Sequence, residues 1–329
     1  MPLGSTGGLG HFHASLILGN HIRLFPGLYS QTTTQDMENM FCTIEKESIT
    51  GMLLTPGLIL RILQNHKKRF EVVGKNLNYL LANVTPMSRE SIIELLELLP
   101  NLRFCTYYGS TEASRSIVNV CRENRGYEDF TGKATSNVEI KINNPNKDGE
   151  GEIFIKGPNV MKGYLNRGDD GFCDGWFKSD DIGKIDENGF IQILGRLKDT
   201  ISIDGLKMFP TELENILISY PKIKDVGVCS ILDKRTYNQI GLAVVAEEKA
   251  NKEELTKEIY KILKIKYKLN ETDLYSYKIP NKIYFQESIP RTDLGKVRRD
   301  DLAPLLFKNN PPFHISKEKL WEQEYKKFL

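Results

Sequence analysis

The chain has 329 residues, which is more than one ordinary domain and predicts two. Its 45 basic and 43 acidic residues leave a formal net charge of +2, which is too balanced to indicate a nucleic-acid partner. Hydrophobic residues make up 40% of the chain and the mean hydropathy is −0.37, as expected of a globular protein in water. With no apolar run long enough for a transmembrane segment and no charged-then-apolar leader at the start, we expect a cytoplasmic protein.

The distribution of cysteine and histidine argues against disulfides and metal centres. The 5 cysteines are scattered, odd in number and without a C-x-x-C pair, which suits a reducing compartment. His11 and His13 are expected on one face of a strand, but the sequence places no further metal ligands near them.

The first hundred residues predict one α/β layer. Residues 4–10 are expected to form a Gly-rich turn, followed by a buried apolar run. Residues 36–64 have the pattern of helix, strand and helix, and residues 77–84 that of a further strand. Ser88 is expected to cap a helix that Pro100 stops.

Residues 104–112, FCTYYGSTE, predict a strand that runs into a Gly turn at the carboxyl edge of a sheet, where open α/β folds bind ligands. Short strands over residues 131–176 then suggest a small barrel. The Asn-Gly turn at residues 188–189 predicts a hairpin between residues 182–185 and 190–194.

The remaining sequence predicts a compact α/β unit. Pro210 opens a helix with a single apolar face, made of Leu213, Ile216, Leu217 and Tyr220. Strands are expected over residues 226–232, 240–245 and 282–285, and Asn251 is expected to cap a helix between the last two. A loop with a Gly-Lys pair at residues 295–296 follows.

Polar residues that packing does not require lie along this frame. On composition alone, Asp181, Arg196 and Lys198 are surface groups whose ion pairs contribute little. The order of the motifs, however, is Asp-Asp-x-Gly, Asn-Gly, Gly-Arg-x-Lys-Asp and Pro-x-Glu-x-Glu. This order closely resembles the core of the adenylate-forming superfamily, which includes acyl-CoA synthetases, aryl-CoA ligases, luciferases and peptide-synthetase adenylation domains.

The resemblance implies an α/β fold in which the C-terminal part of the adenylating enzyme's large domain precedes a small α+β domain. It assigns residues 1–197 to an AMP-binding domain, with a partial α/β sheet layer over 1–114 and a small β-barrel over 115–197. Residues 198–306 form the C-terminal domain, with Lys198 as the hinge, and residues 307–329 are a tail without a role.

The resemblance also implies which residues bind nucleotide. Tyr108 stacks on adenine in the turn that includes Gly109, Thr111 hydrogen-bonds the α-phosphate, and Glu112 holds Mg²⁺. Asp181 accepts from the ribose hydroxyls, and Arg196 supports the ribose or the phosphate.

Two further residues receive a role from the resemblance. Lys296 is the expected catalytic lysine, and Gly205 lines the channel through which a thiol approaches. The chain departs from the family in two places. A Ser/Thr/Gly-rich phosphate loop that ends in Pro-Lys-Gly is not found, and residues 82–86 read Ala-Asn-Val-Thr-Pro where a Gly pair is usual.

The implied function is ATP-dependent activation of a carboxylic acid to an acyl-adenylate, followed by transfer to coenzyme A or to the pantetheine of a carrier protein. The expected acid is a medium- or long-chain fatty acid, on family frequency alone. The alternative is an inactive remnant that binds only nucleotide or a partner. The sequence leaves open which acid is used, which thiol accepts it, and the oligomeric state.

Overall fold

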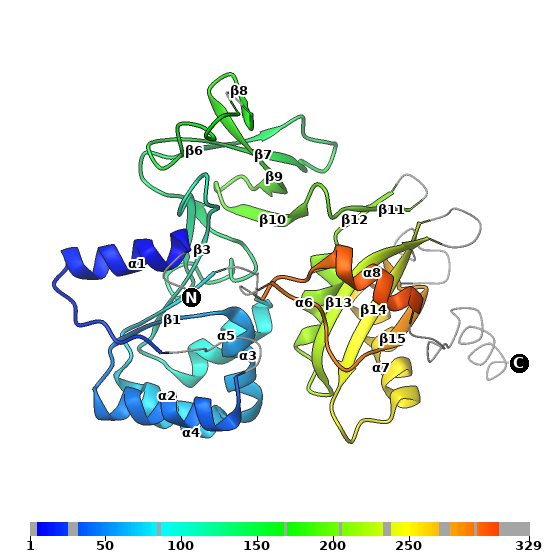
Figure 1. The fold of residues 1–329 in the computed structure, drawn as a ribbon, viewed down its shortest axis with the longest axis horizontal. Coiled ribbons are helices and arrows are strands. Elements are labelled where there is room, and N and C mark those ends of the chain that lie inside the picture. The colour runs from blue at the N-terminus through cyan, green and yellow to red at the C-terminus, as the bar shows by residue number, and fades with distance from the viewer. Residues whose placement is uncertain are drawn as a thin grey trace, which may run out of the picture. The chain divides into compact units, whose positions relative to one another are not determined.

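The computed structural model describes residues 5–25, 32–83, 87–167, 170–203, 206–232, 238–269, 277–292 and 295–308. The chain divides into two compact units. Unit 1 comprises Met1–Leu194 with Asp293–Gly295, and unit 2 comprises Gly195–Thr292 with Lys296–Leu329. Each unit is described by itself (Figure 1).

Unit 1 contains a five-stranded mixed sheet in the order β1-β2-β3-β4-β5. The first three strands run parallel and β4 and β5 join antiparallel, so the sheet is the expected α/β layer. The carboxyl end of β3 leads directly into the turn that holds the candidate nucleotide residues. The strands are β1 (Gly51–Leu54), β2 (Tyr79–Ala82), β3 (Arg103–Tyr108), β4 (Ile117–Val120) and β5 (Lys133–Ala134).

Helices pack beside this sheet, where α3 contacts both α4 and α5 and α2 packs on α4 (Figure 1). The Ser88 side chain accepts a hydrogen bond from the Ser91 amide, which confirms the predicted cap of α5. Arg122 holds the other end of α5 by donating to the carbonyls of Leu96, Leu99 and Leu102. The helices are α2 (Thr34–Lys46), α3 (Pro56–Asn65), α4 (Lys67–Val73), η1 (Gly74–Asn76) and α5 (Arg89–Leu98).

The N-terminal segment differs from the prediction. Instead of a Gly-rich turn followed by a buried run, α1 (Thr6–Ile17) is a helix that begins in the glycines. Ser5 caps it by accepting from the Gly8 amide at 3.1 Å, and a good cap offsets the poor helix propensity of glycine. The expected strand placement of His11 and His13 is therefore wrong. The apolar residues at the end of α1 are exposed, with Ile17 at 85%.

The second sheet of unit 1 has the order β10-β9-β7-β6, with β8 paired to β9. The predicted hairpin is confirmed, because the Asp186 carboxylate accepts from the amides of Asn188 and Phe190 and Gly189 has a φ of +78°. The order has two ends, β6 and β10, and an isolated bridge between Gly132 and Ile191 links β10 to the segment before β5. The small barrel over residues 115–197 stays a prediction. The strands are β6 (Glu139–Asn143), β7 (Gly151–Lys156), β8 (Phe172–Cys173), β9 (Trp176–Ile185) and β10 (Ile191–Arg196).

Unit 2 is an α/β sandwich around the three-stranded sheet β13-β14-β15. β13 and β14 are antiparallel, and β14 and β15 are parallel. Asn251 caps α7 by accepting from the amides of Glu253 and Glu254, as predicted. The elements are β11 (Ile201–Ile203), β12 (Leu206–Met208), α6 (Pro210–Ile218), β13 (Ile223–Leu232), β14 (Asn238–Ala246), α7 (Lys252–Tyr267), β15 (Lys282–Phe285) and α8 (Arg299–Lys308).

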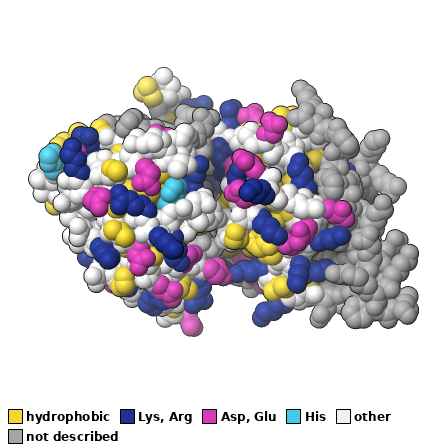
Figure 2. All heavy atoms as spheres, turned by 90° about the horizontal axis from the view of Figure 1, so that it is seen from below, with side chains coloured by type: hydrophobic (Ala, Val, Ile, Leu, Met, Phe, Trp, Pro, Cys, Tyr) yellow, Lys and Arg dark blue, Asp and Glu magenta, His cyan; other side chains and the backbone are white. Residues whose placement is uncertain are grey.

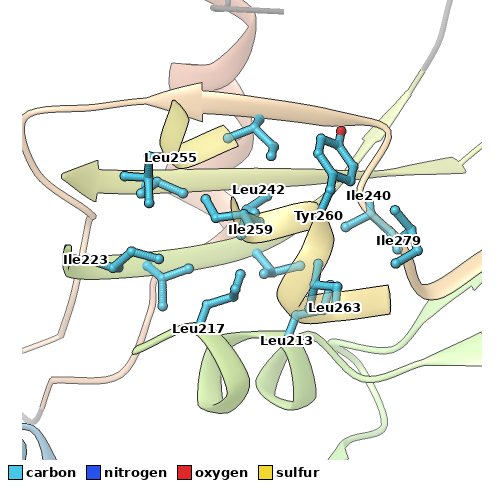
Figure 3. Packing of buried hydrophobic residues seen from close by; sticks show 14 of the residues in the cluster. Leu213, Leu217, Ile223, Ile240, Leu242, Leu255, Ile259, Tyr260, Leu263 and Ile279 are labelled. Atoms are coloured by element: carbon cyan, nitrogen blue, oxygen red, sulfur yellow. The ribbon is translucent and has the colours of Figure 1, made fainter. Parts of the chain in front are cut away.

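Both faces of this sheet are covered. Alternate residues of β13 and β14 point to a large cluster with α6 and α7, and the others point to a smaller cluster with α8. Figure 3 shows Leu213 and Leu217 of α6 pointing toward side chains of α7 and the strands. Both leucines are fully buried, which confirms the predicted apolar face of α6.

The molecular surface is mixed in charge. On the face drawn in Figure 2, basic and acidic side chains are interspersed and no large patch of one sign stands out. Within the described part of the chain, every helix is too short or too polar to cross a membrane.

Candidate active site

The turn after β3 brings several predicted site residues together. A Cβ added at Gly109 would lie 2.3 Å from the backbone nitrogen of Arg115, so only glycine allows the chain to return so closely on itself. The Ser110 amide donates to the Ala113 carbonyl at 3.0 Å, and the Ala113 amide donates to Ser110 Oγ at 3.1 Å. Thr111 and Glu112 therefore lie at the tip of a tight, internally bonded turn.

Side chains from outside the turn hold its return limb. Asn159 Nδ2 donates to the Ser114 carbonyl and to Ser116 Oγ, each at 2.9 Å. Thr135 Oγ1 donates to the Arg115 carbonyl at 3.0 Å. These hydrogen bonds fix the geometry of the turn without a ligand, which suits a binding site.

Tyr108 and Asp181 are linked, although they lie 73 residues apart in the sequence. The Tyr108 hydroxyl donates to Asp181 Oδ2 at 2.5 Å. The Asp181 side chain comes from β9, and its own amide donates to Ser179 Oγ at 3.1 Å. Asp181 is only 7% exposed, so this carboxylate has a fixed orientation at the end of β3.

Glu112 is held by the loop that follows β7. Its Oε1 accepts from the Tyr164 hydroxyl at 2.9 Å, and its carbonyl accepts from the Met161 amide at 2.7 Å. The hydrogen bond to Glu112 raises the pKa of Tyr164, so this phenol stays protonated as a donor. In the described residues, no three His, Cys, Asp or Glu side chains gather to hold a metal ion. A cation at Glu112 would take its other ligands from phosphate and water.

Arg196 ends β10, and Lys198 follows in an exposed turn. The Arg196 carbonyl accepts from the Asp199 amide at 3.2 Å and from Thr200 Oγ1 at 3.0 Å, which closes this turn. Gly205 lies outside the described residues, so its predicted place in a thiol channel stays a prediction, as do the roles of Arg196 and Lys198.

Lys296 lies in a loop of unit 2 and is exposed. Arg291 and Val297 form an isolated antiparallel bridge across the loop, and the Thr292 amide donates to the Lys296 carbonyl at 2.8 Å. Gly295 has a φ of +84°, which glycine adopts without strain. The loop therefore has a defined base.

Arginine–carboxylate pairs fix both ends of the Lys296 loop. Arg291 forms a bidentate ion pair with Asp225, in which Arg291 Nε lies 3.0 Å from Asp225 Oδ2. Arg299 Nη2 lies 2.9 Å from both carboxylate oxygens of Glu214 on α6. Burial raises the pKa of Glu214, and the charge of Arg299 acts in the opposite direction. These pairs join the loop to the core of unit 2.

A partly parallel α/β sheet with a polar turn at its carboxyl edge belongs to the class of folds that bind ligands there. The comparisons with known proteins identify the family. The AMP-binding enzyme model matches residues 1–165, and the AMP-binding enzyme C-terminal domain model matches residues 212–296. The chain therefore belongs to the AMP-binding enzymes, and the predicted fold class is confirmed.

Individual relatives are similar over most of this chain. It is 30% identical to a 2-succinylbenzoate–CoA ligase of Listeria monocytogenes, over 81% of the chain and 54% of the relative. It is 29% identical to 4-coumarate–CoA ligase 3 of rice, Oryza sativa, over 84% of the chain and 50% of the relative. The chain thus spans about half the length of these curated relatives.

Solved structures of o-succinylbenzoate CoA synthetase from Bacillus subtilis show the same fold. The complex with the acyl-adenylate intermediate has a TM-score of 0.76 at 25% identity, over 96% of this chain and 61% of that one. The complex with ATP and a magnesium ion has a TM-score of 0.73 at 25% identity, over 92% and 60%.

Sequence reasoning did not single out several residues that the structure places at the site. Tyr164 was expected only as part of a short strand, and Arg115 and Tyr107 had no role. Tyr107 directly precedes Tyr108 on β3, so its side chain was expected on the opposite face of the sheet, and this could have singled it out. Nothing in the sequence pairs Tyr164 with Glu112, which lies 52 residues away.

Proposed function

We propose that this protein activates a carboxylic acid with ATP and transfers the acyl group to a thiol, as a CoA ligase does. The observation that carries the proposal is the braced turn after β3, where the hydrogen bond between Tyr108 and Asp181 orients both side chains. Family membership and the ligase relatives support the same chemistry. Because the chain spans about half of those relatives, the complete activity is part of the proposal.

In this proposal, ATP lies across the carboxyl edge of the sheet. Adenine stacks on Tyr108 beside Gly109, the ribose hydroxyls donate to Asp181, and Thr111 donates to the α-phosphate. Arg196 supports the ribose or the phosphate with a permanent positive charge. The B. subtilis homologue that was solved with ATP and a magnesium ion supports this choice of nucleotide and metal.

The residues around Glu112 fit Mg²⁺. A carboxylate is the hard oxygen donor that this ion prefers, and Tyr164 fixes its orientation through Oε1. When bound, Mg²⁺ supplies neutralisation of phosphate charge. We assign Lys296 the same electrostatic task at the transition state, with Lys198 as the pivot and Gly205 at the thiol channel.

The relatives favour a different acid from the one expected. The expectation of a fatty acid finds no support, because the relatives named above act on 2-succinylbenzoate and 4-coumarate by name. We therefore propose an aromatic carboxylic acid. Coenzyme A, which appears in both names, is the proposed acceptor in place of a carrier protein.

Turnover tests the proposal directly. The chain is mixed with ATP, Mg²⁺, coenzyme A and either 2-succinylbenzoate or 4-coumarate, and acid-dependent AMP release is measured. Lys296→Ala should slow AMP release about a hundredfold or more. Lys261→Ala, which changes an exposed residue of α7, should leave AMP release unchanged. Nucleotide binding without acid-dependent AMP release would instead support a nucleotide-binding remnant.

A further inference from the structure

Arg115 is partly buried, and no salt bridge joins it to a carboxylate among the described residues. Its Nε and Nη2 atoms are buried without a hydrogen-bond partner among the described residues. A guanidinium that loses its water without gaining a partner is strongly destabilising, so buried arginines are normally paired. An unpaired one beside a candidate active site points to an anion that arrives as ligand.

The surroundings of Arg115 are polar and enclosed. A Cβ added at Gly10 would lie 2.8 Å from Arg115 Nη2, so the backbone of α1 comes close to the guanidinium. The next residue of α1, His11, hydrogen-bonds through Nε2 to the Tyr107 hydroxyl at 2.8 Å, and their rings meet edge to face. In Figure 1, α1 lies beside the end of β3.

Arg115 is the positive charge of this cluster at neutral pH. Burial, followed by the charge of Arg115, lowers the pKa of His11 to about 4. Burial raises the pKa of Tyr107 to about 12. Two neutral hydrogen-bonding groups and one cation therefore make up this cluster, and a guanidinium is the donor that a carboxylate prefers.

The backbone also indicates that the side chain at this position matters. Arg115 has a φ of +51°, a left-handed conformation that glycine and asparagine adopt more readily. Thr135 Oγ1 holds it there through the Arg115 carbonyl. The turn thus keeps an arginine in a conformation that disfavours one.

We propose that Arg115, Tyr107 and His11 form a subsite for a second, unreactive carboxylate of the acid substrate. This inference rests on the proposed function and narrows its substrate class to acids with an anionic group at each end.

The topology supports that assignment. Tyr107 and Tyr108 are consecutive on β3 and face opposite sides, while Arg115 and Glu112 belong to one turn. An acid whose reacting carboxylate lies at Thr111 and Glu112 needs to cross only this turn to place its other end at Arg115.

A matched pair of ligands tests the subsite. Two non-hydrolysable acyl-adenylate mimics are compared by calorimetry, one with a free carboxylate at the far end of its aromatic acyl group and one with the methyl ester. The intact protein should bind the carboxylate form at least tenfold more tightly. In Arg115→Met, which keeps much of the side-chain volume, this ratio should fall to about one while the ester affinity stays unchanged.

Gly10→Ala provides a second variant that keeps the charge. The added methyl group displaces the guanidinium and should reduce the preference, whereas Gly57→Ala, where a Cβ meets nothing within 4 Å, should not. An equal preference in the intact protein and Arg115→Met would overturn the subsite. Lack of preference in the intact protein would overturn it as well.

An NMR titration without nucleotide distinguishes failure of the subsite from failure of the proposed function. Succinate, a simple dicarboxylate, should shift the His11 ring resonances in the intact protein and not in Arg115→Met. If neither mimic binds but succinate gives this result, the subsite holds and the nucleotide proposal fails. If inorganic phosphate alone gives the shifts, the site binds a free anion and the assignment to the acid is wrong.

Discussion

The two turns that carry the candidate chemistry differ in what holds them from outside. The turn after β3 is held by side chains from other segments: Asn159 and Thr135 bond its returning residues, and Tyr164 bonds Glu112. The described part of the Lys296 loop is closed by backbone contacts between its two limbs, and Arg291 and Arg299 at its ends pair with carboxylates. Its lysine is exposed.

This difference matches two chemical tasks. A turn that orients a nucleotide needs several groups in fixed relation, and their mutual hydrogen bonds supply that. A loop that presents a single charge needs only a stable base, because an ammonium group is a compact charge on a flexible stem. Each turn can therefore be disturbed separately, and the following changes are ordered from the largest expected effect to the smallest.

The largest effect is expected at the base of the Lys296 loop. Arg299→Met leaves the Glu214 carboxylate buried without its cation, and the free energy of unfolding should fall by about 3–5 kcal/mol. Chemical denaturation measures this. The control is Arg298→Met, which removes an exposed pair with Asp301 and should cost less than about 1 kcal/mol. Equal losses in the two variants would contradict a structural role for the buried pair.

A smaller effect is expected at the end of β3. Tyr108→Phe removes the donor to Asp181, a hydrogen bond to a buried charged group that typically contributes about 1.5–3 kcal/mol. The melting temperature should fall accordingly. Tyr127→Phe, which removes an exposed hydrogen bond with Asn188 and keeps the ring, is the matched control. If Tyr108→Phe is as stable as that control, Asp181 is oriented by other groups.

His11 predicts a dependence of stability on pH. Burial holds its pKa near 4 in the folded state, whereas the unfolded chain takes up the proton near 6.5. The unfolded state therefore binds more protons between these pH values. The free energy of unfolding is highest above pH 6.5 and falls as the pH is lowered toward 4. Because His11 keeps some contact with solvent, this loss in the free energy of unfolding is on the order of 1–2 kcal/mol.

Urea denaturation at several pH values compares the parent protein with His11→Gln. The variant should lose less stability than the parent over this window. His13→Gln, at an exposed position of the same helix, should follow the parent. Identical pH curves for the parent and His11→Gln would show that His11 titrates normally.

The smallest effect is expected at Tyr164. It is 37% exposed, so Tyr164→Phe should change the free energy of unfolding by less than about 0.5 kcal/mol. The consequence appears in function instead, because Glu112 loses a hydrogen bond that orients its carboxylate. Mg²⁺-dependent ATP affinity should weaken while Mg²⁺-independent binding stays the same. Equal weakening with and without Mg²⁺ would remove Tyr164 from the proposed metal site.

Local signals in the sequence predicted much of the fold. Ser88 and Asn251 cap their helices as expected, and Leu213 and Leu217 point into the core of unit 2. These features depend on residues a few positions apart, where periodicity and capping chemistry are readable. The helix at residues 6–17 was misjudged because glycines usually signal a turn, and here the Ser5 cap prevails.

The contacts that build the candidate site could not be read in the same way. The pairs Tyr108–Asp181 and Arg299–Glu214 join residues 73 and 85 positions apart. Resemblance to a family suggested roles for Tyr108 and Asp181, but not that they hydrogen-bond each other. The cluster around Arg115 depends on how α1 packs against β3, and no local pattern specifies that packing.

The most direct measurement is calorimetric binding of a non-hydrolysable acyl-adenylate mimic to the parent chain, to Asp181→Asn and to Asp180→Asn. Asp180 is the exposed neighbour of Asp181, and its φ of +59° suits asparagine equally well. The proposed site predicts that binding is tight in the parent and Asp180→Asn and at least tenfold weaker in Asp181→Asn. Equal affinity for all three, or no binding to the parent chain, would contradict the account.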